Sequence, residues 1–398
     1  MNKDTYCIKP FIHIATERNG DYFACCLSAS STGHNLAKDN VVDAWNSEFY
    51  KELRHDLVNG VKNSNCERCW LTESKGFTSR RQFSNEEYGK VLTEPLPAPI
   101  ELDIKTGNIC NLKCITCNQL ASSQHEKEVI EWKKQDIKLP TWLAEIEINN
   151  PVYDITDVSN VGINLDASLQ SAAVLGLQGG EPFASPLTLE LLDYCIEKGY
   201  NKKLSISATT NLSSVTTKII DRLTSFAGSG IGISYDHVDP EKFHYIRYPG
   251  EYKHLVKNLN TVINDRNIGW GISFTLSIFN ALDLDKIFEK FIELSSQRNF
   301  KFLAGHLVLA PNYFDVEYLE VEQKRKMLAS INRFLNGNHA LVDQQEFINR
   351  YSDIHKIVET VPDDFEEVVR ERTRVLDLYD KTRGTDYQKL FPYIKRYE

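Results

Sequence analysis

The sequence has no long hydrophobic run and no excess of positive charge. Among its 398 residues, no apolar stretch approaches the roughly 20 residues that a membrane-spanning helix needs. The first residues also lack the apolar core of a secretion signal. The formal net charge of -9 argues against a broad nucleic-acid surface, although it leaves room for a local basic groove. We therefore expect a cytoplasmic globular protein with no membrane partner, for which nucleic acid is a disfavoured partner.

The cysteines are unevenly distributed. There are nine, and in a cytoplasmic chain they are more typical of metal ligands or redox groups than of structural disulfides. Three of them, Cys110, Cys114 and Cys117, lie within the stretch GNICNLKCITCNQ, and no fourth cysteine follows nearby. An N-terminal group consists of Cys7, Cys25, Cys26, Cys66 and Cys69. Cys195 stands alone on the apolar face of a predicted helix, where we expect a buried small hydrophobe. Two clusters predict two sites.

Strand-like and helix-like segments alternate from residue 100 onward. The predicted strands are 100–104, 173–178, 203–210, 231–236, 271–279 and 300–309. Several are almost continuously apolar, as expected for strands that are covered on both faces. A helix is predicted over 185–199, with Ser185 as its N-cap and a stop at Gly199, and another helix follows Ser213. This βα repetition predicts an α/β fold whose parallel sheet is open or partly closed into a TIM-like barrel, with the functional groups at the C-terminal strand ends.

Composition divides the chain into three predicted domains. Residues 1–94 form a small irregular region, with a hairpin of strands from FIHIAT and DYFACC and a helix ending at Gly60. Such a small region would struggle to build its own core, so a metal staple is physically reasonable. The proline-rich stretch near residue 95 leads into the alternating region, 95–314. Residues 315–398 are charged and predicted to be helical.

Three closely spaced thiolates without a fourth suggest a particular kind of metal site. Thiolates select zinc or iron–sulfur clusters. A structural zinc usually takes four ligands from paired C-x2-C knuckles, and no partner knuckle occurs in this region. A four-iron cluster normally takes four cysteines, so three leave one iron without a protein ligand. That open iron can bind nitrogen and oxygen donors of a cofactor or substrate.

The C-x3-C-x2-C array after the first strand resembles the signature of the radical S-adenosylmethionine (SAM) superfamily. The resemblance implies that Cys110, Cys114 and Cys117 hold a catalytic [4Fe–4S] cluster whose open iron binds SAM. It also implies a partial (β/α)6 barrel, reductive cleavage of SAM to a 5′-deoxyadenosyl radical, and an electron donor such as flavodoxin or ferredoxin. One departure is Thr116, because the family usually has an aromatic or apolar residue there.

The stretch LQGGEPF, at the end of the second predicted strand, resembles the GGE motif of the same family. The resemblance assigns the SAM amino group to Gly179, Gly180 and Glu181. Glycines permit a close backbone approach, and Glu181 offers an acceptor for an ammonium group. The alternative is an ordinary tight turn between a strand and a helix.

Further cofactor-binding candidates follow the next strands. By resemblance they are Thr210, Asn211, Ser234, Asp236 and Arg247, which would contact SAM or the substrate. For Thr210 and Asn211, a strand end with a capping Asn is an equal alternative. Strand alternation places Tyr235 on the opposite side from Ser234 and Asp236. Asn280 and His306 are weaker candidates, because a lone histidine in an apolar strand is more often packed and hydrogen-bonded.

The N-terminal cysteines resemble a second kind of cluster site. Their order, with WNSEFYKELR before CERCW, is similar to the SPASM/twitch domains that bind an auxiliary [4Fe–4S] cluster beside many radical SAM barrels. Cys7, Cys66 and Cys69 are the firmer ligands, and Cys25 or Cys26 completes the set. In those relatives the module usually follows the barrel, whereas here it precedes it. A structural zinc is the alternative.

These patterns together predict a radical SAM enzyme with two clusters. Its substrate would be a peptide or a small molecule, and the reaction an oxidation, epimerisation or crosslink. The alternatives are a non-catalytic iron–sulfur or zinc protein, an enzyme using SAM without radicals, and an RNA-modifying radical SAM enzyme.

Overall fold

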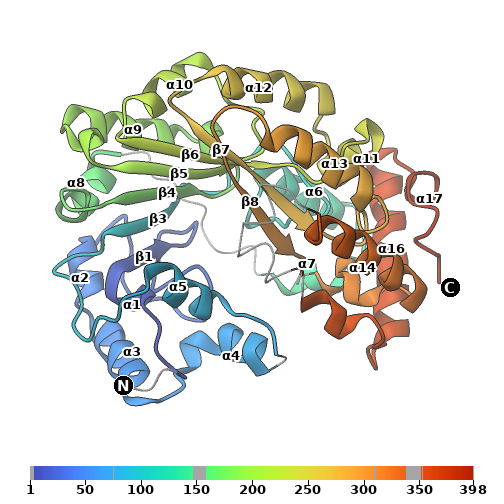
Figure 1. Cartoon of the computed structure of the whole chain (residues 1–398), viewed down its shortest axis with the longest axis horizontal. Coiled ribbons are helices and arrows are strands. Elements are labelled where there is room, and N and C mark those ends of the chain that lie inside the picture. The colour runs from blue at the N-terminus through green and yellow to red at the C-terminus, as the bar shows by residue number, and fades with distance from the viewer. Residues whose placement is uncertain are drawn as a thin grey trace. The chain divides into compact units, whose positions relative to one another are not determined.

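The computed structural model describes residues 4–74, 76–146, 158–308, 311–337, 351 and 353–397. Figure 1 shows strands and helices alternating along most of the chain. The last residue of the strand predicted over 300–309 lies outside the described residues. Within the described part of the chain, no helix is long and apolar enough to cross a membrane.

The strands belong to one eight-stranded sheet with the order β2-β1-β3-β4-β5-β6-β7-β8. Their bounds are His13–Thr16 (β1), Tyr22–Phe23 (β2), Glu101–Lys105 (β3), Val174–Gln178 (β4), Ser205–Thr210 (β5), Gly228–Ser234 (β6), Gly269–Leu276 (β7) and Phe300–Leu307 (β8). Strand β2 is antiparallel to β1, whereas β1/β3, β3/β4, β4/β5 and β7/β8 are parallel pairs. From β3 to β8, neighbouring strands in the sheet are also consecutive along the chain, as expected of a partial (β/α)6 barrel. The predicted α/β class is confirmed.

Helices connect these strands. The described α-helices are Lys9–Ile12 (α1), Val41–Trp45 (α2), Glu48–Asn59 (α3), Glu67–Ser74 (α4), Arg80–Tyr88 (α5), Ser123–Lys134 (α6), Thr141–Glu145 (α7), Val158–Leu169 (α8), Pro186–Glu197 (α9), Thr217–Thr224 (α10), Pro240–Ile246 (α11), Tyr252–Asn264 (α12), Leu284–Ser295 (α13), Val321–Leu335 (α14), Phe365–Arg383 (α16) and Tyr387–Leu390 (α17). Each strand from β3 to β8 is followed by at least one of them, as the alternating sequence predicts.

By contacts within the chain, the protein forms two compact units. Unit 1 comprises residues 1–109, 149–209 and 215–231, and unit 2 comprises 110–148, 210–214 and 232–398. Within unit 1, the N-terminal region joins the main sheet, because His13 of β1 pairs with Glu101 of β3. The functional boundaries at residues 94 and 314 stay predictions.

Two local predictions were wrong in detail, and a third was only partly right. FIHIAT is not all strand, because α1 occupies its first two residues and Pro10 starts that helix well. The helix predicted before Gly60 is two helices, since Asn46 ends α2 and Ser47 precedes α3. Ser185 holds the predicted N-cap position of α9, but its side chain does not cap the helix, because its hydroxyl donates to the Thr106 carbonyl at 2.9 Å.

The first three barrel strands are not apolar on both faces. In β3, Leu102 and Ile104 are buried, whereas Glu101, Asp103 and Lys105 on the other face are only partly buried. Strands β4 and β5 alternate in the same way. Strand β7 is buried almost throughout, as predicted. The polar face of β3 to β5 carries side chains that line a cavity. These polar groups can form hydrogen bonds with a ligand, which apolar side chains could not do.

Candidate functional site

The three-cysteine loop follows β3 and is held by its backbone. Cys110 is buried, and Cys114 and Cys117 are half-buried. The Lys113 amide donates to the Tyr248 carbonyl at 2.7 Å, and the Ile115 amide donates to the Ile246 carbonyl at 2.9 Å. Because both anchors flank Cys114 directly, backbone hydrogen bonds hold the chain on either side of this cysteine. The loop is therefore rigid where a cluster ligand has to be positioned.

A buried ion pair lies next to this loop. The Arg247 guanidinium donates to Asp236 Oδ2 at 2.8 Å through Nε, and the Thr275 amide donates to Asp236 Oδ1 at 3.0 Å. Burial by itself lowers the pKa of Arg247, but Asp236 and the thiols of Cys114 and Cys110 raise it above its usual value. Burial raises the pKa of Cys114 to about 11, and Arg247 acts against that shift. Asp236 thus holds a permanent cation beside thiols that must lose protons to bind iron.

Asn211 also reaches the cysteine loop. Its amide nitrogen lies 3.9 Å from Cys110 Sγ, within hydrogen-bonding distance for sulfur, and donates to Asn111 Oδ1 at 3.2 Å. Its oxygen accepts the Ser213 amide at 2.9 Å, so the capping alternative is also realised. Hydrogen bonds to ligand sulfurs are one of the means by which a protein sets cluster potential.

The remaining candidates after the strands have local structural partners. Thr210 Oγ1 accepts the Leu212 amide at 2.9 Å. Ser234 ends β6 half-buried, while Tyr235 is fully buried and packs against Phe291, in agreement with the predicted alternation. Asn280 is also buried, and its amide nitrogen donates to the carbonyls of Asp236 and Thr275. The SAM or substrate contacts assigned to these side chains stay predictions.

The GGE segment packs closely against the backbone that leads into the cysteine loop. A Cβ on Gly180 would lie 2.5 Å from the Ile109 carbonyl oxygen, and one on Gly179 would lie 2.7 Å from that of Gly107. Gly179 also has a φ of 137°, which side chains rarely adopt. The Glu181 amide donates to the Ile109 carbonyl at 2.8 Å. An ordinary strand-to-helix turn does not need two glycines in such contact, so this packing is specific to the segment before Cys110.

The Glu181 side chain is almost fully buried, at 1% exposure. Its Oε1 accepts the Phe183 amide at 3.2 Å and caps the short 3-10 helix Pro182–Ala184. A buried carboxylate held in this way has a defined orientation, which a cofactor-binding acceptor needs.

A buried charge network supports the loop from the C-terminal region. Glu128 of α6 accepts from Lys113 at 2.7 Å and from Arg383 of α16 at 2.6 Å. The Arg383 and Glu128 side chains are both nearly inaccessible. Lys113 belongs to the cysteine loop itself, so α16 is tied to that loop through Glu128. Sequence reasoning missed these residues, because nothing in the sequence indicates that positions so far apart form an ion pair.

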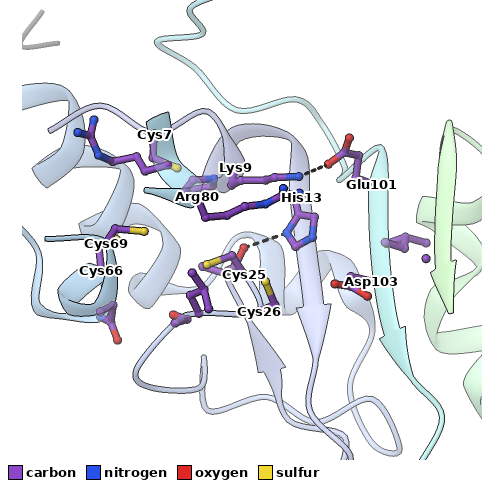
Figure 2. A pocket seen from close by; sticks show the side chains of 18 of the residues that line it. Cys7, Lys9, His13, Cys25, Cys26, Cys66, Cys69, Arg80, Glu101 and Asp103 are labelled. Carbon is purple, nitrogen blue, oxygen red and sulfur yellow. Dashed lines mark hydrogen bonds and ion pairs between the residues drawn. The ribbon is translucent and has the colours of Figure 1, made fainter. Parts of the chain in front are cut away.

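The N-terminal cysteines surround a second site. They line a cavity of about 290 Å³ in unit 1 (Figure 2). Burial raises the pKa of Cys7 and of Cys66 to about 12, and mutual repulsion adds to both shifts: Cys7 interacts with Cys66 and Cys69, and Cys66 with Cys25 and Cys69. Burial, Cys26, Cys7 and Cys69 raise the pKa of Cys25. Cys7, Cys25, Cys66 and Cys69 thus form a mutually interacting set of four thiols, the number that a fully ligated cluster takes.

Cys26 differs from its neighbour Cys25. It is exposed to the cavity, whereas Cys25 is half-buried. Burial raises the pKa of Cys26, and the groups that act on it next are charged side chains: Asp103, Arg80, Lys105 and Lys9. Figure 2 shows Cys26 on the side of the cavity where Asp103 lies. Of the two adjacent candidates, the geometry therefore favours Cys25 as the fourth ligand.

Arg81 supplies positive charge beside the four thiols. It lowers the pKa of Cys7, Cys66 and Cys69, opposing the effect of burial, which is larger. Its guanidinium bonds Glu73 at 2.8 Å and the Tyr6 carbonyl at 2.7 Å, so its position is fixed. Four thiolates around a cluster carry a net negative charge, and a nearby cation stabilises it.

A single metal ion and a four-iron cluster make different demands on the positions of their ligands. Among the described residues, no three His, Cys, Asp or Glu side chains converge closely enough to hold one metal ion. Each cysteine of a four-iron cluster binds a different iron, so its ligands stand farther apart than those of zinc.

Comparisons with known proteins agree with the N-terminal assignment. Residues 7–70 match the SPASM family, an iron-sulfur cluster-binding domain. This match confirms the SPASM-like domain predicted from the sequence, and it includes all five N-terminal cysteines. No curated protein matches the chain.

Several solved structures resemble the fold at low identity. Native anSMEcpe with bound AdoMet is 20% identical, with a TM-score of 0.42, over 61% of this chain and 63% of that chain. The same protein with AdoMet and the Kp18Cys peptide is 21% identical, with a TM-score of 0.41, over 61% and 62%. Streptococcus suis SuiB bound to S-adenosylmethionine is 12% identical, with a TM-score of 0.37, over 72% and 49%. This chain thus covers less than two thirds of each of these structures, and the TM-scores are too low to assign an activity.

Proposed function

We propose that the chain is a radical SAM enzyme with an auxiliary iron–sulfur cluster. In this proposal Cys110, Cys114 and Cys117 hold a [4Fe–4S] cluster whose open iron binds SAM. When bound, the cluster and SAM together supply a 5′-deoxyadenosyl radical. The protein contributes the placement of these groups and the exclusion of water, because a free carbon radical reacts with whatever is near.

One observation carries this proposal most directly. The GGE segment and the residues before Cys110 pack so closely that neither Gly179 nor Gly180 has room for a side chain. The GGE segment thus packs against the residues directly before the cysteine array, all of them within unit 1. The carbonyl and amide groups there are oriented by the backbone alone.

The other residues take supporting roles. Arg247 stabilises the thiolate form of Cys114, and Asp236 positions Arg247. Asn211 donates toward Cys110 Sγ. Glu181 is the acceptor proposed for the SAM ammonium group. In the N-terminal region, Cys7, Cys25, Cys66 and Cys69 hold the auxiliary cluster, and Arg81 offsets its charge.

The substrate is proposed to be a peptide or a small molecule, oxidised, epimerised or crosslinked after hydrogen abstraction. Two clusters per chain suit this chemistry, because a second cluster can accept an electron or ligate the substrate.

Anaerobic reconstitution followed by incubation with SAM and dithionite tests the proposal. The fully loaded protein should contain about eight irons per chain and should release 5′-deoxyadenosine. Cys114→Ala should abolish that release and remove roughly half of the iron, the share of one of two such clusters. Cys195→Ala is the matched control, since Cys195 is a buried cysteine outside both clusters. A fully loaded wild-type protein that releases no 5′-deoxyadenosine would show that it is a non-catalytic or non-radical iron–sulfur protein.

A further inference from the structure

The cavity in unit 1 has a polar end that the four cluster thiols do not use. Here Asp103 of β3 lies on the side of the cavity away from Cys66 and Cys69, and Cys26 lies toward it (Figure 2). Gln178 of β4 also lines the cavity. A cluster bound by Cys7, Cys25, Cys66 and Cys69 would occupy the other end. The Asp103 end is therefore space that the auxiliary cluster alone does not explain.

Asp103 is only half satisfied in this position. Gln178 donates to its Oδ2 at 3.2 Å, whereas its Oδ1 is buried and has no hydrogen-bond partner. A buried acceptor without a partner destabilises the folded protein, so such atoms persist mainly where a ligand satisfies them. Burial raises the pKa of Asp103 to about 6, even though Lys105, Lys9 and Arg80 act in the opposite direction.

The space beside Asp103 Oδ1 is kept open by Gly176 of the neighbouring strand. A Cβ on Gly176 would lie 3.3 Å from this oxygen, closer than side chains normally approach. On the neighbouring strand β1, His13 contacts the Ala24 carbonyl through Nδ1 at 3.0 Å. A carbonyl can only accept, so Nδ1 carries the proton and Nε2 is left as an acceptor. The cavity thus presents two acceptors and calls for a donor.

The charges around Asp103 indicate which kind of hydrogen-bond donor the cavity would bind. Lys9 is paired with Glu101 at 2.8 Å, and Lys105 is paired with Glu17. Together with Arg80, these cations already act on Asp103, so an ammonium ligand would meet positive charge on several sides. A neutral hydroxyl avoids this repulsion and still donates a hydrogen bond to a carboxylate.

We propose that the Asp103 end of this cavity binds a hydroxyl group of the substrate, through Asp103 Oδ1, next to the auxiliary cluster. This inference rests on the proposed function, because it takes Cys25 as the cluster ligand and leaves Cys26 as a free thiol in the subsite. The hydroxyl can belong to a serine or threonine side chain of a peptide or to a free alcohol.

Two solvents of the same size test the hydroxyl requirement without any turnover. Anaerobic crystals of the cluster-loaded protein are soaked in 2-propanol or in acetone, which differ in whether the oxygen carries a proton. We expect 2-propanol with its oxygen within hydrogen-bonding distance of Asp103 Oδ1, and no acetone there. Equal occupancy by both solvents, or by neither, would overturn the inference. Parallel soaks with glycerol and with a serine tripeptide then separate a free alcohol from a peptide as the source.

Two variants separate this inference from the proposed function. Cys26→Ser should keep about eight irons per chain, whereas Cys25→Ser should lose roughly half. Asp103→Asn should keep its iron but lose the bound 2-propanol. Glu86→Gln, on the exposed side of α5, should change none of these. Loss of iron from Cys26→Ser would show that Cys26 is a ligand and would overturn the subsite, whereas a wild-type protein without 5′-deoxyadenosine release would contradict the proposed function alone.

Discussion

The two cysteine sites are built in different ways. At the N-terminal site, four thiols from three segments surround a cavity, and fixed cations such as Arg81 stand beside them. At the other site, three thiols come from one short loop, which backbone hydrogen bonds and two glycines fix in place. In the proposed function, the first set of thiols closes around its cluster, whereas the second leaves one iron open. A closed site suits electron transfer or redox poise, and an open one suits binding of a second molecule.

Gly180→Ala should give the largest effect. Its Cβ would lie 2.5 Å from a backbone oxygen, and backbone can yield only by moving the segment before Cys110. We expect a loss of roughly 3 kcal/mol or more of unfolding free energy, measured by chemical denaturation, together with loss of the loop cluster. Gly230→Ala is the control, because a Cβ there meets nothing within 4 Å. Equal effects of both substitutions would mean that the close packing of the GGE segment is unimportant.

Arg383→Met should weaken the same loop from the C-terminal region. It leaves Glu128 buried with Lys113 as its remaining ion-pair partner, and breaking such a buried pair costs about 3 kcal/mol. Iron analysis should show reduced loading of the loop cluster, with the N-terminal cluster retained. The exposed pair of Arg370 and Glu366 offers the control, and Arg370→Met should change stability by less than about 0.5 kcal/mol. Full iron loading of Arg383→Met would show that α16 does not support the loop.

Asp103→Asn should have a smaller effect, at the N-terminal site, and one that depends on pH. The pKa of Asp103 in the folded protein is about 6, above its unfolded value of 3.8, so its ionisation opposes folding. The stability that its protonated form contributes is complete below about pH 4 and is lost as the pH rises through 6. The amide cannot ionise, so the variant should be more stable than wild type at pH 8, by at most about 3 kcal/mol, and close to it at pH 4.

The charges that face Asp103 are those of Lys105, Lys9, Arg80 and Glu17. The measurement is urea denaturation of both proteins across this pH range. A constant difference between the two proteins at all pH values would show that Asp103 does not titrate with a raised pKa. A gain in stability together with loss of the bound alcohol would mark a residue retained for function at the expense of stability.

Much of the fold followed from the sequence, because strands and helices alternate with strong apolar patterns. All six predicted barrel strands are present, with shifts of one to three residues at their ends. The helix break at Asn46 was missed, since the apolar spacing continues across it. Glu101, Asp103 and Lys105 alternate with apolar residues in the sequence, which is the pattern of a strand with one polar face. The prediction of strands covered on both faces rested on the apolar residues alone.

The cysteine sites were predicted only in outline. Spacing identified the three-cysteine loop and the N-terminal group. It cannot separate Cys25 from Cys26, because the side chains of adjacent residues differ only in the direction in which they point. Asp103, Arg81 and Arg383 could not be assigned from sequence either. Their roles come from partners far along the chain, such as Gln178 for Asp103 and Glu128 for Arg383.

The central claim is that one cluster has an open iron that binds SAM and the other does not. Electron paramagnetic resonance of the reduced protein, recorded with and without SAM, tests it most directly. We predict two overlapping cluster signals, of which SAM shifts only one, and no SAM-dependent change when Cys110, Cys114 and Cys117 are all replaced by Ala. A SAM-induced shift that persists in that triple variant, or the absence of any shift in the wild-type protein, would contradict the account.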